Sequence, residues 1–320
     1  MKGNRKTVLF FVCLSLVFFC AASSLMAETS PVKPVSFRFG TLPVIQALPL
    51  FVADEKGFFA EAGIDVTLDT FPSAMEKDMA LSTGEIAGYF GDMLTPITLR
   101  ANGVLLTIVA TNFTTPGEQR MFALVAAPKY TEETLETLIQ EGVARAPHTL
   151  LDYLMAKMLV AADYDGKIAL IDIVKIPLRL QMLLTSQVPA ALLPEPLVTF
   201  AVTKGCRVVA DDASLGVSAT ILAFTDDFIA VSPKTVRAFL GAVNRASLFI
   251  NAAPGEARRI MNRTCRIPAP LTDSFPLPLF PEISHPREEL VMDVYRWLTE
   301  QKYITKELTY DDIVSHEPAF

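Results

Sequence analysis

The sequence predicts an α/β protein with two modules of similar plan, each a mainly parallel sheet flanked by helices. Short runs rich in β-branched and aromatic residues alternate with runs of helical periodicity through most of the chain. One such series covers residues 35–110, and a second series of the same kind starts near Met121. A chain of 320 residues is long enough for both modules.

The chain begins with a pattern typical of a secretory signal peptide. Three basic residues precede an apolar run over residues 7–20, and small residues then lead to Ala27, after which we expect cleavage. The run is shorter than the roughly 20 residues of a membrane span. An uncleaved anchor remains an alternative. A lipid anchor on Cys20 is disfavoured, because two phenylalanines precede that cysteine where lipidation needs small residues. We therefore expect an exported, periplasmic protein.

The charge of the chain argues against nucleic acid as a partner. The formal net charge is −7, and loss of a leader with three basic and no acidic residues would make it −10. A phosphate backbone repels a protein of this charge.

The cysteines and histidines predict no metal site. Cys206 and Cys265 lie outside the leader, and their sequence positions leave open whether they form a disulfide. His148, His285 and His316 are scattered, and there is no CxxC motif. We expect neither a metal nor a cofactor.

The first module follows the order of strands and helices that a parallel sheet requires. The predicted strands are residues 35–39, 64–68, 84–90 and 104–110, and the predicted helices are residues 75–82 and 92–101. An apolar loop and helix with turns at Gly57 and Gly63 connect the first two strands. In open α/β sheets ligands bind at the carboxyl ends of strands, so this loop is a candidate wall of a binding site.

The second module repeats this alternation. Its predicted strands are residues 121–126, 142–146, 168–176, 190–193 and 207–210, and its predicted helices are residues 131–139, 149–162, 178–185 and 197–204. Thr131 is the expected cap of the first of these helices, and Thr149 with Asp152 forms an expected cap pair for the second.

After the second module, the chain continues with a strand, a long helix and a proline-rich stretch. We expect the strand at residues 220–224 and the helix at residues 233–252. Prolines interrupt residues 267–286 too often for regular structure. The last helix is expected to begin at Pro286, since proline suits the first helical turn.

Several phrases of this chain resemble, in order, the periplasmic substrate-binding proteins of the SsuA-like group, which bind sulfonates, nitrate or a thiamine pyrimidine precursor. These phrases are GFFAEAGIDVTL at 57–68, ALSTGEI at 80–86, ANGV at 101–104 and LPEPL at 193–197. The resemblance covers residues 36–315. It implies a two-lobed type II periplasmic binding protein fold, with residues 36–120 and 221–320 in one lobe and residues 121–220 in the other.

The resemblance also implies a function. A monomer would capture a small organic molecule between its lobes by hinge closure and deliver it to an ABC permease in the membrane. The expected ligand contacts lie in loops that follow strands of both lobes, and residues 112–114 are one of these loops. The expected contacts are Pro43, Gln46, Ser73, Asp92, Met93 and Thr114 in the first lobe, and His148, Thr149, Arg179 and Glu195 in the second.

For three of these residues a structural role is an alternative to ligand binding, and for two others their chemistry gives a specific reason to expect ligand binding. Asp92 and Thr149 could be plain helix caps, and His148 could be a surface residue. A positive charge in the first turn of a helix opposes the dipole, so Arg179 could serve an anionic group or a salt bridge. Glu195 lies between two prolines and could accept hydrogen bonds from a ligand amine or ring N–H.

The chain departs from the group at residues 145–148, which read Arg-Ala-Pro-His where relatives carry a glycine- or serine-rich turn. Fewer free backbone N–H groups there argue against a simple sulfonate or nitrate ligand, and favour an organic ring or a partly apolar molecule. Two other classes stay open. They are enzymes of the same fold, similar to pyrimidine synthases or menaquinone-pathway enzymes, and a ligand-sensing partner of a membrane receptor. The sequence has no GxSxG motif and no clustered histidines and carboxylates, so an enzyme is not expected.

Overall fold

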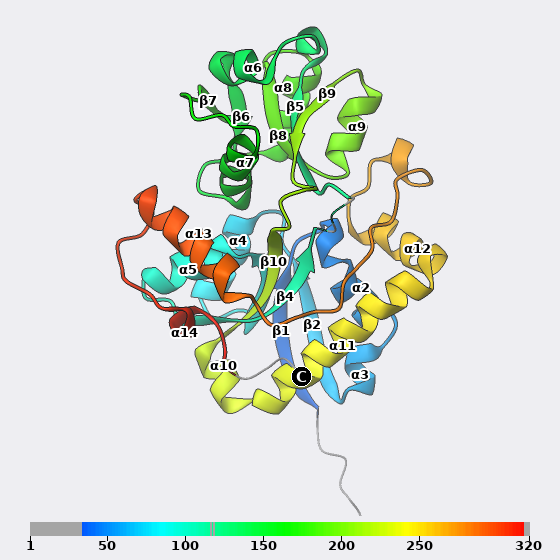
Figure 1. Cartoon of the computed structure of the whole chain (residues 1–320). Coiled ribbons are helices and arrows are strands. Elements are labelled where there is room, and N and C mark those ends of the chain that lie inside the picture. Colours follow the sequence, from blue (N-terminus) through cyan, green and yellow to red (C-terminus); the bar gives the residue numbers. More distant parts are fainter. Residues whose placement is uncertain (1–33, 116, 118, 317–320) are drawn as a thin grey trace, which may run out of the picture. The chain divides into compact units, whose positions relative to one another are not determined.

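The computed structural model describes residues 34–115, 117 and 119–316. The predicted leader and its cleavage site lie outside these residues. The described part contains two five-stranded sheets, a first sheet with the order β2-β1-β3-β10-β4 and a second sheet with the order β7-β6-β8-β5-β9 (Figure 1). Each sheet with the helices around it is called a lobe below.

The bounds of the elements follow the predicted alternation closely. The first sheet is made of β1 (Val35–Thr41), β2 (Ile64–Thr70), β3 (Gly88–Asp92), β4 (Leu106–Thr114) and β10 (Ser218–Thr225). The second is made of β5 (Phe122–Ala126), β6 (Val143–Arg145), β7 (Leu170–Asp172), β8 (Ala190–Pro194) and β9 (Arg207–Asp211). The helices are η1 (Ile45–Ala47), α2 (Leu48–Glu55), α3 (Phe58–Glu61), α4 (Ala74–Ser82), α5 (Leu94–Ala101), η2 (Pro128–Tyr130), α6 (Leu135–Glu141), α7 (Leu150–Ala161), α8 (Ile176–Leu184), α9 (Leu197–Thr203), α10 (Asp226–Val231), α11 (Pro233–Ala252), α12 (Pro254–Thr264), η3 (Ala269–Leu271), α13 (Glu288–Glu300) and α14 (Tyr310–Ile313).

Both sheets contain parallel and antiparallel pairs. Strands β2, β1 and β3 pair in parallel, whereas β10 is antiparallel to β3 and β4. In the second sheet β7, β6 and β8 pair in parallel, and β5 is antiparallel to β8 and β9. In each sheet the antiparallel strand is the one by which the chain arrives from the other sheet. The two-sheet α/β prediction is confirmed, and the order of elements alone did not indicate the direction of these two arriving strands.

Several predicted helix starts differ from the structure. Thr134, not Thr131, caps α6, since its hydroxyl accepts from the Thr137 backbone N–H at 3.2 Å. Thr149 does stand at the N-cap of α7, but its hydroxyl donates to the Ala146 carbonyl instead of capping the helix. The last long helix begins at Glu288, two residues after the expected Pro286.

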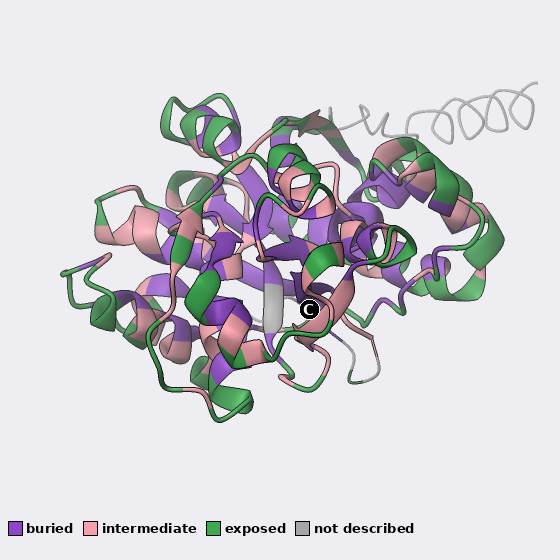
Figure 2. Cartoon of the chain, turned by 90° about the horizontal axis from the view of Figure 1, so that it is seen from above, coloured by how far each residue is buried: buried purple, intermediate pink, exposed green. Residues whose placement is uncertain are grey.

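An aromatic cluster joins the first sheet to its covering helices. Phe39 and Phe224 face Phe239 of α11, with ring centroids 4.5 Å and 5.3 Å from the Phe239 centroid. Phe39 and Phe239 are fully buried, and Figure 2 shows that the buried residues gather in the strands and on the helix faces turned towards them. Truncation of such a ring costs about 3–5 kcal/mol.

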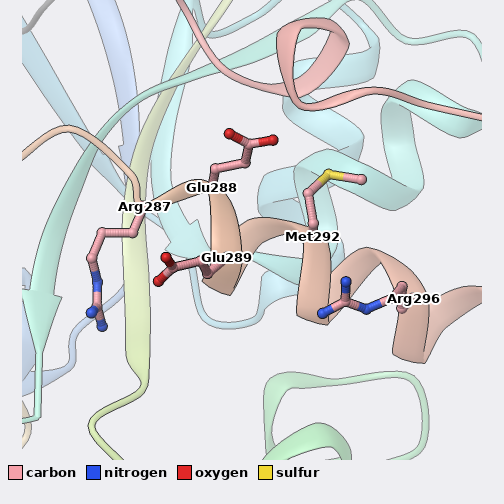
Figure 3. A pocket seen from close by; sticks show the side chains of 5 residues that line it. All are labelled: Arg287, Glu288, Glu289, Met292 and Arg296. Atoms are coloured by element: carbon pink, nitrogen blue, oxygen red, sulfur yellow. The ribbon is translucent and has the colours of Figure 1, made fainter.

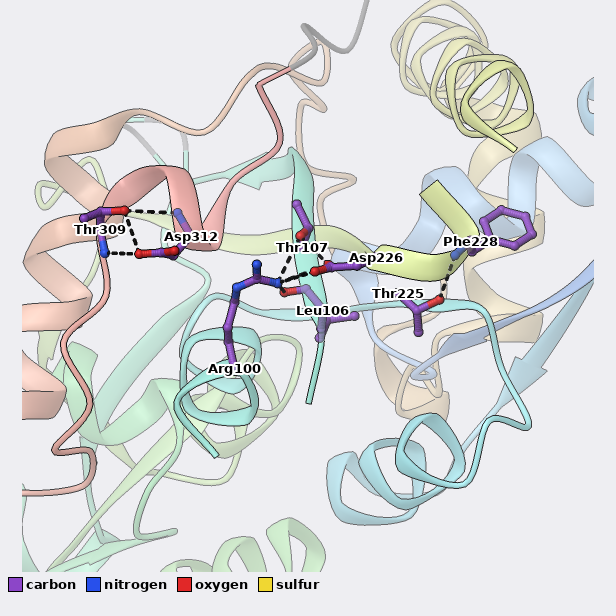
Figure 4. A network of polar contacts seen from close by, with 8 residues as sticks. All are labelled: Arg100, Leu106, Thr107, Thr225, Asp226, Phe228, Thr309 and Asp312. Atoms are coloured by element: carbon purple, nitrogen blue, oxygen red, sulfur yellow. Dashed lines mark hydrogen bonds and ion pairs between the residues drawn. The ribbon is translucent and has the colours of Figure 1, made fainter. Parts of the chain in front are cut away.

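At the far end of the first sheet, a polar network ties α5 to the start of α10 (Figure 4). Arg100 donates to both carboxylate oxygens of Asp226, at 3.1 Å and 2.8 Å, and to the Leu106 carbonyl. Thr107 also donates to Asp226, at 2.6 Å. This network lies at the end of the sheet where β4 begins and β10 ends, which is the end remote from the carboxyl ends of β1 and β3.

Cys206 and Cys265 are free and buried, which answers the question that the sequence left open. Burial raises the pKa of the Cys206 thiol to about 11 and that of Cys265 to about 12. Among the described residues, no group of three or more histidines, cysteines and carboxylates could hold a metal ion. None of the described helices has the length and apolar character needed to cross a membrane.

Candidate functional site

Three buried polar side chains lie near one end of the strands of the first sheet, where β1 and β4 end and β10 begins. They are Thr41, Asn112 and Thr220, with exposed fractions of 0%, 0% and 6%. Each has a side-chain oxygen without a hydrogen-bond partner among the described residues. Such an orphaned polar group costs about 1–3 kcal/mol, so these three residues, here called the polar floor, need an explanation.

The strand register places the polar floor on one face of the sheet. Phe39 and Phe224 both lie opposite Gly88 and so share a face. Side chains alternate along a strand, so Thr41 and Thr220 point to the same face as these two phenylalanines. Helix α11 covers that face through the aromatic cluster, and α2 packs against α11.

Asn112 joins the polar floor through a β-bulge. Phe113 lies opposite Thr220 and Thr111 lies opposite Ile221, so Asn112 is an extra residue between two paired ones. Bulges often lie beside binding sites, because they redirect a side chain. The Asn112 amide nitrogen donates to the Gln46 carbonyl of η1 at 2.7 Å. Only the nitrogen can donate to a carbonyl, so the amide oxygen is left as an acceptor.

On the opposite face of the sheet, a buried lysine forms a second cluster. Lys77 of α4 is 1% exposed; its ammonium lies 2.7 Å from Asp78 and 3.2 Å from the ring centroid of Tyr89. A Cβ at Gly91 would lie 2.6 Å from the Tyr89 ring and 3.3 Å from the Lys77 ammonium, so glycine makes room for both. Burial lowers the pKa of Lys77 and raises that of Asp78. The lysine is thus already paired.

The remaining sequence-predicted residues of the first lobe lie around these clusters. The Asp92 carboxylate accepts from the backbone N–H and hydroxyl of Thr95 at 2.9 Å and 3.2 Å, which is the helix-cap role. Ser73 caps α4 by accepting from the Glu76 N–H at 3.3 Å. Gln46 and Met93 are buried, whereas Pro43 and Thr114 are half-buried.

In the second lobe, Glu195 lies at the end of β8 and its carboxylate is largely occupied. One oxygen accepts from Arg120 at 2.8 Å and from the Thr199 hydroxyl at 3.0 Å, and the other accepts from the Thr199 backbone N–H at 3.0 Å. Glu195 is 6% exposed. The carboxylate therefore stabilises the start of α9 and the chain near Arg120, which sequence reasoning did not foresee.

Arg179 and His148 of the second lobe each have partners of their own. Arg179 is fully buried, donates to the Ile173 carbonyl at 2.8 Å, and has two nitrogens without a partner among the described residues. Burial lowers its pKa to about 10. His148 is exposed, has a φ of 60°, and donates its backbone N–H to Asp152 at 3.1 Å.

One carboxylate ties together the two chain segments that cross between the sheets. Asp212 follows β9 and is 2% exposed. It accepts from the Thr115 hydroxyl at 2.8 Å, and from the backbone N–H groups of Met121 and Phe122 at 2.8 Å and 2.9 Å. Burial raises the pKa of Asp212, and these hydrogen bonds oppose the rise. No motif in the sequence singled out this residue.

A separate hollow of about 570 Å³ lies beside the start of α13, where Arg287, Glu288, Glu289, Met292 and Arg296 line it (Figure 3). It contains none of the sequence-predicted residues. Arg287 donates to the Gly216 carbonyl at 3.4 Å, and Arg296 pairs with Asp293 at 3.7 Å. The mixed charges and open position of these side chains are typical of a solvated helix surface, so we place the candidate site at the polar floor.

Solved structures share this two-lobed α/β fold of periplasmic binding proteins. The aliphatic sulphonate binding protein SsuA from Escherichia coli superposes with a TM-score of 0.76 at 16% identity, covering 88% of this chain and 97% of that one. SsuA from Xanthomonas axonopodis pv. citri, bound to MOPS, has a TM-score of 0.75 at 15% identity over 88% and 99% of the two chains. The nitrate-binding protein NrtA from Synechocystis PCC 6803 has a TM-score of 0.67 at 15% identity over 88% and 84%.

The family follows from the sequence itself. The sequence profile of the NMT1-like family matches residues 30–265, more than half of the chain. The chain belongs to the NMT1-like family. No sequence among the curated proteins matches it. The fold and the SsuA-like resemblance predicted from the sequence are thereby confirmed.

Proposed function

We propose that this protein is the extracytoplasmic ligand-binding component of an ABC importer. The observation that carries the proposal is the polar floor: unpaired, buried hydrogen-bonding groups at the carboxyl-end edge of a sheet, in a fold whose solved examples include sulfonate- and nitrate-binding proteins. A ligand that pairs with these groups would remove their cost. No observation of this structure favours an enzyme.

For this proposed binding protein we keep the sequence-predicted lobes, residues 36–120 with 221–320 and residues 121–220, with crossings near residues 119–121 and 218–221. Strand β10 begins at Ser218, so Thr220 belongs to the first sheet although the predicted boundary lies just after it. The network around Asp212 supports these positions, since it joins Thr115 before the first crossing to a residue between β9 and the second crossing. A signal peptide cleaved near Ala27 would export the protein as a monomer to the periplasm.

The polar floor favours a neutral ligand that donates hydrogen bonds, although Arg179 in the second lobe keeps two nitrogens without a partner among the described residues. Lys77, Arg120 and Arg145 each already pair with a carboxylate, namely Asp78, Glu195 and Asp152. The Asn112 oxygen can only accept a hydrogen bond, and it would repel a sulfonate or nitrate oxygen. An organic molecule with N–H or O–H donors fits these groups.

A thermal-unfolding screen with matched compounds tests the proposal. Benzamide with benzoate, and benzenesulfonamide with benzenesulfonate, compare a neutral donor with an acceptor-only anion of the same shape; nitrate, pyrimidines, flavins and amino acids complete the set. A ligand at 100 times its Kd stabilises the fold by about 2.7 kcal/mol, a shift of several degrees.

We expect the larger shift from the neutral member of a pair, and its loss in Asn112→Leu. A larger shift from the anion would contradict the ligand class. If no compound shifts the unfolding of protein that was unfolded and refolded to remove carried-over ligand, the binding function itself is wrong.

A further inference from the structure

A compact set of contacts joins α7 of the second lobe to α13 of the first. The Tyr153 hydroxyl donates to Asp293 at 2.6 Å, and the Lys157 ammonium lies 2.6 Å from the same carboxylate oxygen. Helix α7 packs against β5, β8 and β9, whereas α13 packs against α5 and α14. The contacts therefore connect elements of the two different sheets.

The spacing of these residues makes the contact specific. Tyr153 and Lys157 are four residues apart on α7, and Asp293 and Trp297 are four residues apart on α13, so each pair projects from one face of its helix. The rings of Tyr153 and Trp297 meet edge to face, with centroids 5.6 Å apart. The Tyr303 ring also meets the Trp297 ring edge to face, with centroids 5.5 Å apart.

The burial and the hydrogen-bond partners of these side chains indicate a stable contact. Tyr153 is 1% exposed. The Asp293 side chain keeps about a third of its surface exposed. Its carboxylate nevertheless pairs with the Lys157 ammonium and accepts a hydrogen bond from the Tyr153 hydroxyl. Hydrogen bonds to charged groups are about twice as strong as neutral ones. We call Tyr153, Lys157, Asp293 and Trp297 the α7–α13 clasp.

We propose that the α7–α13 clasp holds the two lobes together before a ligand arrives, and so controls access to the binding site. This inference rests on the proposed function. If the lobes hinge apart about their two crossings, the clasp must break, because it joins elements of different lobes. Its free energy therefore sets the open-to-closed ratio of the ligand-free protein, and that ratio scales the apparent ligand affinity.

Trp297 gives a direct reading of the clasp, because it is the single tryptophan of the sequence. We would measure acrylamide quenching of its fluorescence, and the radius of gyration by small-angle X-ray scattering, on the ligand-free mature chain. The variants are Asp293→Asn and Tyr153→Phe, which keep the size of each side chain. Glu289→Gln, an exposed residue one helical turn before Asp293 that makes none of the clasp contacts described above, is the control.

We expect Asp293→Asn to raise the open-to-closed ratio about tenfold, the equivalent of one charge-assisted hydrogen bond. Quenching and the radius of gyration should both increase, while Glu289→Gln should match the natural protein. Increased quenching at an unchanged radius would mean local loosening of α13 and would overturn the proposal. So would no change in either quantity. If Asp293→Asn fails to fold, Tyr153→Phe decides, since it removes only a hydroxyl.

The outcome is separable from that of the ligand screen. If the clasp variants open but no compound binds, the clasp stands and the transport function fails. If a compound binds and the variants do not open, the clasp fails and the function stands.

Discussion

The Asn112 amide donates to the Gln46 carbonyl, and this one bond determines what the side chain can offer a ligand. Thr41 and Thr220 add hydroxyl groups on the same side of the sheet, without partners among the described residues. Proteins satisfy most buried polar groups, so unpaired ones at the edge where this fold class binds ligands are a functional signal. At the scale of single residues, the site is thus defined by its unmet hydrogen bonds.

Thr220→Val tests whether the polar floor serves a ligand or the fold. The substitution removes an unpaired, buried hydroxyl at nearly constant volume, so the free energy of unfolding should rise by about 1–3 kcal/mol, the cost of the orphaned group. Affinity for the ligand found in the screen should fall about tenfold, the value of one hydrogen bond. Urea unfolding and calorimetric titration measure the two quantities.

Thr115→Val is the matched control. Its hydroxyl donates to the buried Asp212, so its loss should cost about 1–3 kcal/mol of stability. Equal destabilisation by both substitutions would show that Thr220 has a structural partner and would argue against the polar floor.

Gly91→Ala tests the packing of the lysine cluster. An added Cβ would collide with the Tyr89 ring, and overpacking of this kind costs about 1–3 kcal/mol. Gly241→Ala in the middle of α11 meets no atom within 4 Å and should instead stabilise the fold by about 0.5–1 kcal/mol. Urea unfolding measures the stability of both variants. An unchanged free energy of unfolding in Gly91→Ala would mean that the Lys77–Tyr89 contact is loosely packed.

At the scale of helices and strands, most of the architecture was predictable from the sequence. Periodicity and turn residues located the strands to within a few residues, and the long helix at 233–252 agrees with the structure at both ends. Helix caps were less predictable, because several hydroxyl residues precede a helix and tertiary contacts select among them. Thr134 rather than Thr131 is an example.

The candidate site was only partly predictable. Proximity to strand ends drew attention to the loop at Gln46 and to residues 112–114, which include Asn112, whereas Lys77 and Asp212 were overlooked. Lys77 and Asp212 carried no readable signal, because a lysine on a helix and an aspartate in a loop are usually exposed, and only the packed structure shows their burial.

The α7–α13 contact makes a prediction about pH. Burial would raise the pKa of Asp293, but hydrogen bonds from Lys157 and Tyr153 and nearby positive charges outweigh it, so the pKa is lowered below its ordinary 3.8. A carboxylate with a lowered folded-state pKa contributes stability that is complete above the unfolded-state pKa and is lost as pH falls through the folded-state pKa.

Urea unfolding of the natural protein and of Asp293→Asn at several pH values would measure this contribution. The difference in unfolding free energy should be constant above about pH 5, and should shrink as the pH falls below about 4. A difference that grows towards low pH would contradict the assigned ion pair.

At the scale of the whole molecule, each of the two sheets contains one strand that runs antiparallel to its two neighbours. One carboxylate, Asp212, joins the two chain segments that cross between the sheets. The proposed binding protein needs such a connection, because ligand capture between lobes requires that they move about a defined hinge. The α7–α13 clasp then adds a second connection between the lobes that can break and re-form.

The most direct test of the central claim is calorimetric titration of the mature chain with the compound that gives the largest thermal shift, followed by chemical analysis of the recovered compound. Our account predicts one saturable site per chain, weakened by Asn112→Leu and by Thr220→Val, and full recovery of the compound unchanged. Absence of saturable binding, or conversion of the compound into a product, would contradict the assignment as a ligand-binding component of an importer.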